Sequence, residues 1–312
     1  MNVPDLKAVE AATERIRGAI RRTPLTYAAL GGTRIGIKWE NRQEGGAFKL
    51  RGASNRLLAM TEEERARGVV AFSSGNHARG VAIAARRLGM RAAIVMPADA
   101  PGVKIEATRA EGAEIILYDR MTESREEIGA RLAKERGATL VPSFDDPYII
   151  AGQGTVGLEL LEQAEEPVKR IIACCGGGGL SGGIALACPQ AEILIVEPEG
   201  WDDMARSLEV GTPQSVGDNP PPTICDAIQT FRPAEATVAI LRDAGATAVQ
   251  VGDAAVRQAV KWAREECGET VEPGGSAALA ALLSGVVSPR EGDVAIVSGG
   301  NVDPALHAQL IA

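Results

Sequence analysis

Residues 170–183, RIIACCGGGGLSGG, decide the fold, because an apolar run leads directly into glycines and then into a helix-forming segment. The four consecutive glycines Gly176–Gly179 expose backbone N–H groups and let an anion approach the main chain closely. A helix that starts just beyond them adds the favourable end of its dipole. The stretch therefore predicts a buried strand, a phosphate-binding turn and a helix, which together form one unit of an α/β fold.

The glycine turn alone fits two kinds of cofactor. Its spacing Gly177-x-Gly179-x-x-Gly182 matches the dinucleotide-binding pattern, and Glu197 follows where a ribose-binding acid would stand. From this segment a nicotinamide-dependent dehydrogenase is a fair interpretation. A turn without any ligand explains the segment less well, because one or two glycines would be enough for it. The rest of the chain has to decide between the cofactors.

Apolar runs of strand length alternate with helix-period segments along the chain. Near-continuous apolar strands are typical of a parallel sheet that is covered by helices on both faces. We therefore expect an α/β protein with a smaller domain at residues 60–140 and a larger domain made of residues 1–59 and 141–312. The clearest strand-like runs are 68–72, 92–96, 114–118, 170–175, 192–197, 247–251 and 293–297.

The composition argues against several classes of partner. The 312 residues carry a formal net charge of −8 with scattered basic residues, whereas a nucleic-acid partner needs a clustered cationic face. No apolar run approaches the roughly 20 residues that span a bilayer, and the N-terminus lacks the apolar core of a signal peptide. The five cysteines are odd in number and show no C-x-x-C spacing, so we expect reduced thiols in a cytoplasmic protein.

Three further segments place polar side chains where chemistry is expected. Lys49 stands between an aromatic residue and a glycine, SSGNH at 73–77 follows one strand-like run, and SGGN at 298–301 follows another. Each has a plain alternative, which is a surface lysine, a helix cap and a strand-ending turn, respectively. Because the three occur together, two of them at the carboxyl ends of strands, they predict a ligand site.

These motifs make the chain resemble the threonine dehydratase and serine racemase group of pyridoxal-phosphate enzymes, which have fold type II and are similar to the tryptophan synthase β subunit. FKLRGA at 48–53, SSGNH at 73–77, GGGG at 176–179, VEPGG at 271–275 and SGGN at 298–301 arrive in the order and spacing of that group. The resemblance implies two open, twisted, mostly parallel sheets with helices on both faces, in three α/β/α layers. It also implies a homodimer.

By the same resemblance, Lys49 holds pyridoxal 5'-phosphate as a Schiff base and then acts as the base at the substrate Cα. Asn76 would meet the ring hydroxyl of the cofactor, the glycine turn its phosphate, and Ser298 its pyridine nitrogen. Ser74 matches the second acid/base of serine racemase. The expected cofactor site is Phe48, Lys49, Asn76, Gly176, Gly177, Gly178, Gly179, Leu180 and Ser298, and the expected substrate-carboxylate site is Ser73, Gly75, Asn76 and His77.

The implied reaction is β-elimination from a β-hydroxy amino acid, above all L-threonine or L-serine, to a 2-oxo acid and ammonia. A serine hydroxyl at the ring nitrogen, unlike an aspartate, does not stabilise a protonated ring, and this favours expulsion of the β-hydroxyl over transamination. Two related activities stay open. Arg125 matches an arginine that can reach the second carboxylate of 3-hydroxyaspartate, although an exposed helix arginine paired with Glu126 is an equal alternative, and Ser74 permits serine racemisation.

Two other classes of function remain as alternatives. A nicotinamide dehydrogenase would explain the glycine turn but would leave Lys49, residues 73–77 and Ser298 without a role. A catalytically silent ligand-binding relative would have no need to keep the lysine base. Both alternatives therefore explain fewer of the motifs.

Residues 197–203, EPEGWDD, resemble the divalent-cation segment of the racemase-like branch. By this match Glu197 and Asp203 supply carboxylates and Trp201 supplies a backbone carbonyl. Oxygen ligands of this kind suit Mg²⁺ or Ca²⁺. The plain alternative is an acidic, solvated helix start.

Overall fold

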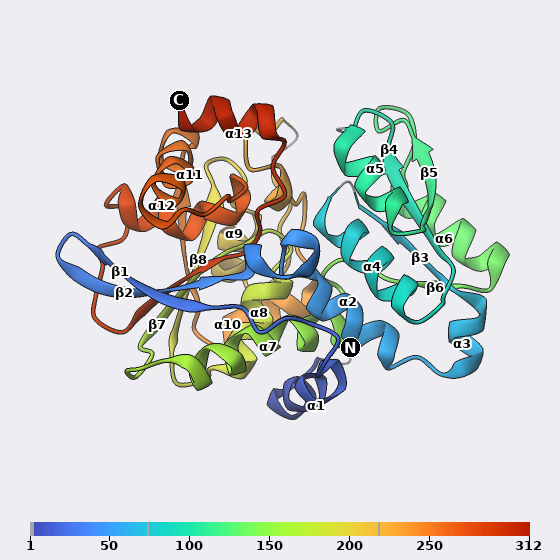
Figure 1. The fold of residues 1–312 in the computed structure, drawn as a ribbon, viewed down its shortest axis with the longest axis horizontal. Helices are drawn as coiled ribbons and strands as arrows, with labels where there is room; N and C mark the ends of the chain where they lie inside the picture. The colour runs from blue at the N-terminus through green and yellow to red at the C-terminus, as the bar shows by residue number, and fades with distance from the viewer. Residues whose placement is uncertain (1–2, 74, 101, 218) are drawn as a thin grey trace.

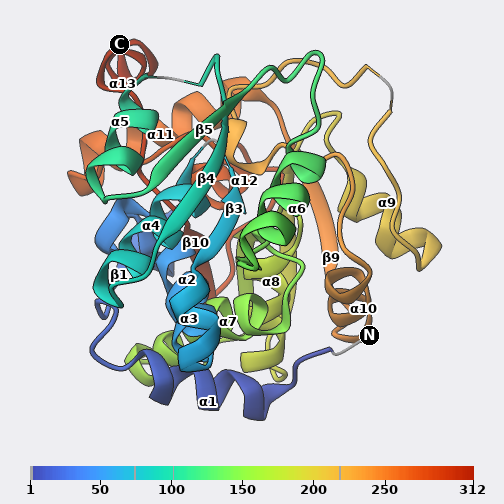
Figure 2. The same ribbon diagram turned by 90° about the vertical axis from the view of Figure 1, so that its right-hand side faces the viewer.

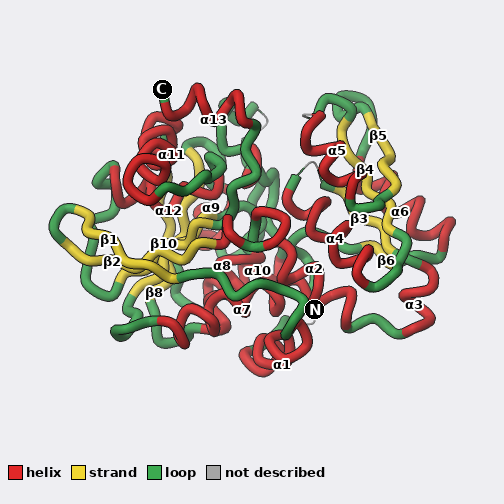
Figure 3. The backbone as a smooth tube through the Cα atoms, viewed as in Figure 1, coloured by secondary structure: helices red, strands yellow, loops and turns green. Residues whose placement is uncertain are grey.

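The structure, a computed structural model, describes residues 3–73, 75–100, 102–217 and 219–312. It contains a six-stranded and a four-stranded sheet, each flanked by helices, which stand side by side (Figures 1 and 3). The predicted α/β class with two mostly parallel sheets is confirmed. No helix of the described part is both long and apolar enough to cross a membrane.

The larger sheet has the strand order β1-β2-β10-β7-β8-β9. Only β1 and β2 pair antiparallel, as a hairpin at one edge, and all other neighbours are parallel. Helix α12 packs on the central strands from one side, and α7 and α8 lie on the other. The strands are β1 (Leu25–Leu30), β2 (Thr33–Trp39), β7 (Arg170–Cys174), β8 (Glu192–Pro198), β9 (Thr247–Val251) and β10 (Asp293–Val297).

The smaller sheet is entirely parallel, with the order β5-β4-β3-β6. Because side chains alternate along a strand, Val69 and Ala71 join the core under α2 and α4, whereas Val70 joins the core under α6. Figure 2 shows α4 and α6 on either side of this sheet. The strands are β3 (Val69–Phe72), β4 (Ala92–Pro97), β5 (Glu114–Tyr118) and β6 (Thr139–Leu140).

Helix α2 links the two sheets, because it packs on α4 beside the smaller sheet and on α7 beside the larger one. The strands of the smaller sheet span residues 69–140, and the division into domains at 60 and 140 stays a prediction. The helices are α1 (Leu6–Ile16), α2 (Lys49–Leu58), α3 (Glu62–Arg67), α4 (Asn76–Arg87), α5 (Gly102–Ala110), α6 (Arg125–Arg136), α7 (Pro147–Gln163), α8 (Gly179–Ala187), α9 (Asp203–Val210), α10 (Glu235–Asp243), α11 (Asp253–Cys267), α12 (Ala277–Leu283) and α13 (Pro304–Ile311).

A buried ionic cluster anchors α2. The guanidinium of Arg51 donates to both carboxylate oxygens of Glu40 at 2.8 Å and to both of Glu159 at 3.1 Å. Lys38 on β2 donates to Glu159 at 2.6 Å, so two cations balance two carboxylates. Arg51, Glu40 and Lys38 are fully buried. The cluster therefore joins α2, β2 and α7 by charge-assisted bonds that no water can replace without opening the core.

Replacing Arg51 with Met should lower the free energy of unfolding of the apoprotein by about 3–5 kcal/mol, because the carboxylates of Glu40 and Glu159 would stay buried without their main partner. Urea denaturation measures this loss. The control is Arg22→Met, which removes a surface pair with Glu162 whose side chains are 53% and 58% exposed, and it should cost only about 0–1 kcal/mol. Equal losses in the two variants would contradict the role given to the cluster.

Candidate active site

Two strand-end turns and the segment before α2 meet between the sheets. Asn76 is the first residue of α4, and its Oδ1 accepts a hydrogen bond from Nδ2 of Asn301 at 2.7 Å. The same Asn301 amide group donates to the carbonyl of Gly45 at 2.6 Å. Asn76 Nδ2 in turn donates to Glu272 at 2.5 Å. The turn after β3 and the turn after β10 are thus joined directly, as expected for carboxyl ends of strands that share a site.

Lys49 lies at the start of α2, beside this junction. The backbone N–H of Phe48 donates to the carbonyl of Ser298 at 3.1 Å, which sets the lysine next to the turn after β10. Lys49 Nζ donates to the carbonyl of Ser143 at 2.9 Å. Loss of water around the amine lowers the pKa of Lys49 to about 8, an effect that the nearby Cys174 and Glu272 only partly offset. The uncharged fraction of this amine near neutral pH is therefore far larger than that of an ordinary lysine, as a nucleophile or base requires.

The glycine turn follows β7 as predicted and leads into α8. Gly178 has a φ of 83°, a left-handed conformation that favours glycine. A Cβ on Gly177 would lie 2.3 Å from the ring of Phe144, so no side chain fits there. Within the described residues, the N–H groups of Gly176, Gly177 and Gly178 make no hydrogen bond. The turn therefore presents unused donors at a helix N-terminus, which is a site for an anion. Leu180 is buried in the core behind it.

In the turn after β3, the side chains of Ser73 and His77 both bond to the protein backbone. The hydroxyl of Ser73 accepts a hydrogen bond from the N–H of Gly75 at 3.2 Å. The side chain of His77 is buried and donates through Nε2 to the carbonyl of Val141 at 2.9 Å. Burial, together with the nearby Lys49, lowers its pKa to about 3, so the ring is neutral. Nε2 of His77 is thus committed to the protein, whereas its buried Nδ1 has no hydrogen-bond partner in the described part of the chain. Ser74 lies outside the described residues.

Ser298 is nearly buried at the end of β10, and its N–H donates to the carbonyl of Gly275. Its hydroxyl accepts from the thiol of Cys174 across a distance of 3.2 Å. Cys174 ends β7, which pairs with β10, so the contact joins two neighbouring strand ends. The sequence predicted only reduced cysteines, so this contact was not predicted.

Glu272 is a second residue without a role predicted from the sequence. It is buried, and its N–H donates to the carbonyl of Gly299 while its carboxylate accepts from Asn76. Burial, followed by the repulsion of Asp226, raises the pKa of Glu272 to about 7. Its motif, VEPGG, was recognised in the sequence, but neither spacing nor composition indicates that this carboxyl group faces Asn76.

The two cations near the turn after β3 differ in their placement. The side chain of Arg125 is 44% exposed and pairs with its neighbour Glu126 at 2.8 Å. It is therefore placed as an exposed helix arginine, which is the alternative that the sequence left open. Lys104 is only 17% exposed and pairs with Asp226 at 2.6 Å, which bridges α5 and the larger sheet's side of the site. Its Nζ lies 3.9 Å from the position that a Cβ on Gly75 would take. Lys104, which was not predicted, therefore lies close to this turn.

In the predicted cation segment, one carboxylate accepts hydrogen bonds and the other has no hydrogen-bond partner in the described part of the chain. Glu197 accepts from the N–H groups of Met204 and Ala205, both at 2.9 Å, and so caps α9. Asp203 is buried, and neither of its carboxylate oxygens has a hydrogen-bond partner in the described part of the chain. Trp201 donates through its indole to the carbonyl of Pro221. No three His, Cys, Asp or Glu side chains gather as a metal site within the described ranges.

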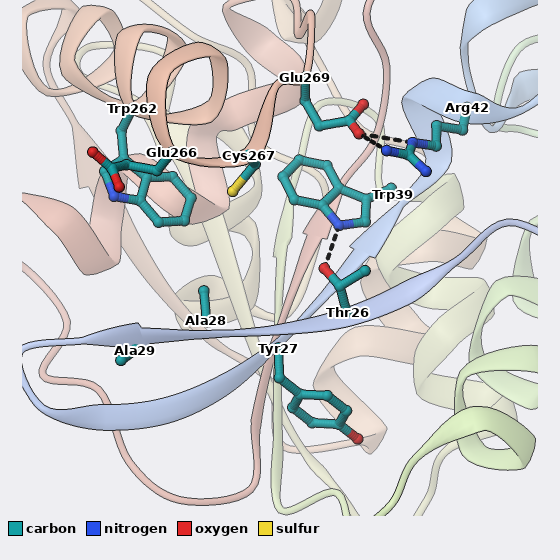
Figure 4. A pocket seen from close by; sticks show the side chains of 10 residues that line it. All are labelled: Thr26, Tyr27, Ala28, Ala29, Trp39, Arg42, Trp262, Glu266, Cys267 and Glu269. Carbon is teal, nitrogen blue, oxygen red and sulfur yellow. Dashed lines mark hydrogen bonds and ion pairs between the residues drawn. The ribbon is translucent and has the colours of Figure 1, made fainter.

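A pocket of about 330 Å³ lies elsewhere, between the β1–β2 hairpin and α11 (Figure 4). An ion pair between Arg42 and Glu269 closes one side of it. None of the predicted site residues lines this pocket, so we assign it no part in the site. Its lining residues are Thr26, Tyr27, Ala28, Ala29, Trp39, Arg42, Trp262, Glu266, Cys267 and Glu269.

Comparison with known proteins identifies the family. The family described as "Pyridoxal-phosphate dependent enzyme" matches residues 16–299. An L-threo-3-hydroxyaspartate ammonia-lyase of Pseudomonas sp is 42% identical, over 100% of this chain and 99% of the relative. Among solved structures, maize serine racemase has a TM-score of 0.92 at 38% identity and covers 99% of this chain and 97% of its own. A threonine deaminase of T.th. has a TM-score of 0.89 at 40% identity, with 96% and 99% covered. This chain therefore belongs to the family of pyridoxal-phosphate dependent enzymes, as its motifs predicted.

Proposed function

We propose that this enzyme eliminates water from a β-hydroxy amino acid and releases a 2-oxo acid and ammonia, with pyridoxal phosphate bound to Lys49. One observation carries the proposal, which is the Lys49 amine with a pKa of about 8 beside the strand-end turns of both sheets. The family match favours this cofactor over the dinucleotide that the glycine turn could also accept. Relatives named as ammonia-lyases support the reaction class.

The residues fit the proposed cofactor. Its phosphate would bind the unused N–H groups of Gly176, Gly177 and Gly178, where the dipole of α8 adds attraction. Its ring hydroxyl would meet Asn76, whose amide is oriented by Asn301 and Glu272. Because an amide NH₂ has two hydrogens and Glu272 uses one, one donor remains for the cofactor. Phe48 and Leu180 would line the same site from α2 and α8.

When bound, pyridoxal phosphate withdraws electrons from the substrate through the amine nitrogen and so makes the proton on the substrate Cα acidic. Lys49 would take that proton, since a base is most effective when its pKa lies near the working pH. The turn of Ser73 and Gly75, with the backbone N–H of His77, would hold the substrate carboxylate. Ser298 would face the ring nitrogen with a hydroxyl, which does not stabilise a positive charge there as a carboxylate would. Ser74 keeps its proposed part as a second acid/base for racemisation.

The partly buried Lys104 bears on the nature of the substrate side chain. We propose 3-hydroxyaspartate as a substrate beside L-threonine and L-serine, because Lys104 is poorly exposed and close to Gly75. A second carboxylate could replace Asp226 as its partner. The name of the Pseudomonas relative agrees with a dicarboxylic substrate. Arg125 would contribute only after it leaves Glu126.

We further propose that Glu197, Asp203 and the Trp201 carbonyl hold Mg²⁺ or Ca²⁺. The two oxygens of Asp203, buried without a hydrogen-bond donor in the described part of the chain, support this, because burial of an unpaired carboxylate is costly unless a cation compensates it. Glu197 retains lone pairs for a metal beyond the two that it uses at α9. A homodimer, a cytoplasmic location and the domain division at residues 60 and 140 remain proposals that rest on the resemblance and the sequence pattern.

Lys49→Ala should abolish formation of 2-oxo acid and ammonia from every substrate, because no other amine is predicted at Cα. The assay offers L-threonine, L-serine and the stereoisomers of 3-hydroxyaspartate to purified enzyme and also follows the enantiomer that remains.

Lys104→Met should raise KM for 3-hydroxyaspartate about ten-fold or more relative to threonine, as expected for one lost charge-assisted bond. Full activity in Lys49→Ala would refute the proposed base, and equal KM changes for both substrates would refute the role of Lys104.

Gly177→Ala should weaken cofactor binding strongly, because its Cβ would displace the ring of Phe144 or the turn itself. Overpacking of this kind costs about 1–3 kcal/mol, so the dissociation constant of pyridoxal phosphate should rise about 5-fold to 150-fold. Titration of the apoprotein with cofactor measures it. Gly182→Ala is the matched control, because a Cβ there meets only Ile240 at an ordinary 3.7 Å. Unchanged binding in Gly177→Ala would contradict the proposed phosphate site.

Mg²⁺ or Ca²⁺ should raise the melting temperature of the enzyme, and removal by a chelator should reverse the rise. At a cation concentration 100-fold above the dissociation constant, the stabilisation is about 2.7 kcal/mol. Asp203→Asn should abolish the response. Asp202→Asn, which alters a neighbouring carboxylate already paired with Arg206, should keep it. A wild-type melting temperature that is independent of both cations would refute the metal site.

A further inference from the structure

The adjacent cysteines Cys174 and Cys175 point to opposite sides of the chain at the end of β7. Side chains alternate along an extended strand, so neighbours face different surroundings. Cys175 donates to the carbonyl of Gly176 at 3.2 Å and accepts from the hydroxyl of Ser181, on the side of α8. Cys174 instead lies 3.2 Å from the hydroxyl of Ser298. Of the two thiols, Cys174 is therefore the one that faces Ser298.

The surroundings of Cys174 keep its thiol protonated. Cys174 and Ser298 are each only 4% exposed. The charged groups that act on the thiol are Lys49 and Glu272, and their effects oppose each other. Burial dominates and raises the pKa of Cys174 to about 11. At neutral pH the group is an S–H, which can donate a hydrogen bond.

The Cys174 thiol and the Ser298 hydroxyl each carry one proton that can be donated. A serine hydroxyl has one proton and two lone pairs, whereas a thiol is a weak donor and a weak acceptor. The arrangement that uses both protons places S–H against the oxygen of Ser298 and leaves the O–H pointing away from Cys174. Within the described residues no other side chain bonds to this hydroxyl. Its proton is therefore available to a group inside the site.

We propose that Cys174 is a positioning residue, whose thiol donates to Ser298 and thereby makes the Ser298 hydroxyl a hydrogen-bond donor to the pyridine nitrogen of the cofactor. This inference rests on the proposed function, because it needs that ring beside Ser298. A nitrogen that accepts a hydrogen bond from Ser298 stays unprotonated. The ring then withdraws electrons less strongly, which favours prompt loss of the β-hydroxyl over transamination.

The test uses holoenzyme loaded with pyridoxal phosphate that carries ¹⁵N in the ring, and it measures the ¹⁵N chemical shift. Cys174→Ala and the better-filling Cys174→Val both remove the donor, whereas Cys174→Ser keeps one. Cys175→Ala is the matched control on the opposite side of the strand. With the S–H absent, the Ser298 hydroxyl can rotate and accept from a protonated nitrogen. The protonated fraction should rise about five-fold, the equivalent of one ordinary hydrogen bond.

The proposal expects the wild-type, Cys174→Ser and Cys175→Ala enzymes to share the shift of an unprotonated nitrogen. Cys174→Ala and Cys174→Val should move towards the protonated value and form about five-fold more pyridoxamine phosphate per turnover. An unchanged ¹⁵N shift in Cys174→Ala and Cys174→Val would overturn the role of Cys174, and so would an equal change in Cys175→Ala. The proposed function would stand in either case as long as the wild type eliminates water from its substrate. A wild type that binds no cofactor would instead overturn both.

Discussion

The ion cluster around Arg51 is the constraint on which the rest of the site depends. Its guanidinium is held by Glu40 and Glu159, so the first turn of α2 cannot shift without exposing buried charge. Lys49 stands two residues earlier on the same helix. The larger sheet and α7 therefore determine where the reactive amine lies, although α2 also packs on the smaller sheet's α4. A buried, balanced set of charges serves here to place a lysine whose own environment lowers its pKa.

The site itself is assembled from strand ends. Parallel strands bring their carboxyl ends to one edge, and the turns after β3, β7 and β10 each contribute polar groups there. The link from Asn76 to Asn301 joins the two sheets, and the Lys104–Asp226 pair bridges them a second time. In the proposed complex, backbone donors bind the phosphate, while side chains handle the ring and the substrate. This division explains why the phosphate turn needs glycines and the other turns need hydroxyls and amides.

The sequence predicted the parts of the fold and site that depend on local pattern. Glycine runs, apolar strands and motif order predict the two-sheet α/β fold and the glycine turn after β7, and the family follows from the same motifs. Contacts between distant segments could not be read in this way. Asn76 and Glu272 are 196 residues apart, and Cys174 and Ser298 are 124 apart, so no periodicity reports their meeting. Arg125 was weighed as inward or exposed because helix position alone does not settle its direction.

Lys49 is proposed to carry the cofactor, and one measurement tests this directly. Reduction of the purified holoenzyme with borohydride would fix the cofactor to the amine that holds it, and mass spectrometry of the digested protein would then locate the pyridoxyl group. We expect that group on the peptide that contains Lys49 and on no other lysine. A pyridoxyl group on Lys104, or a protein that carries none after incubation with pyridoxal phosphate, would contradict the account.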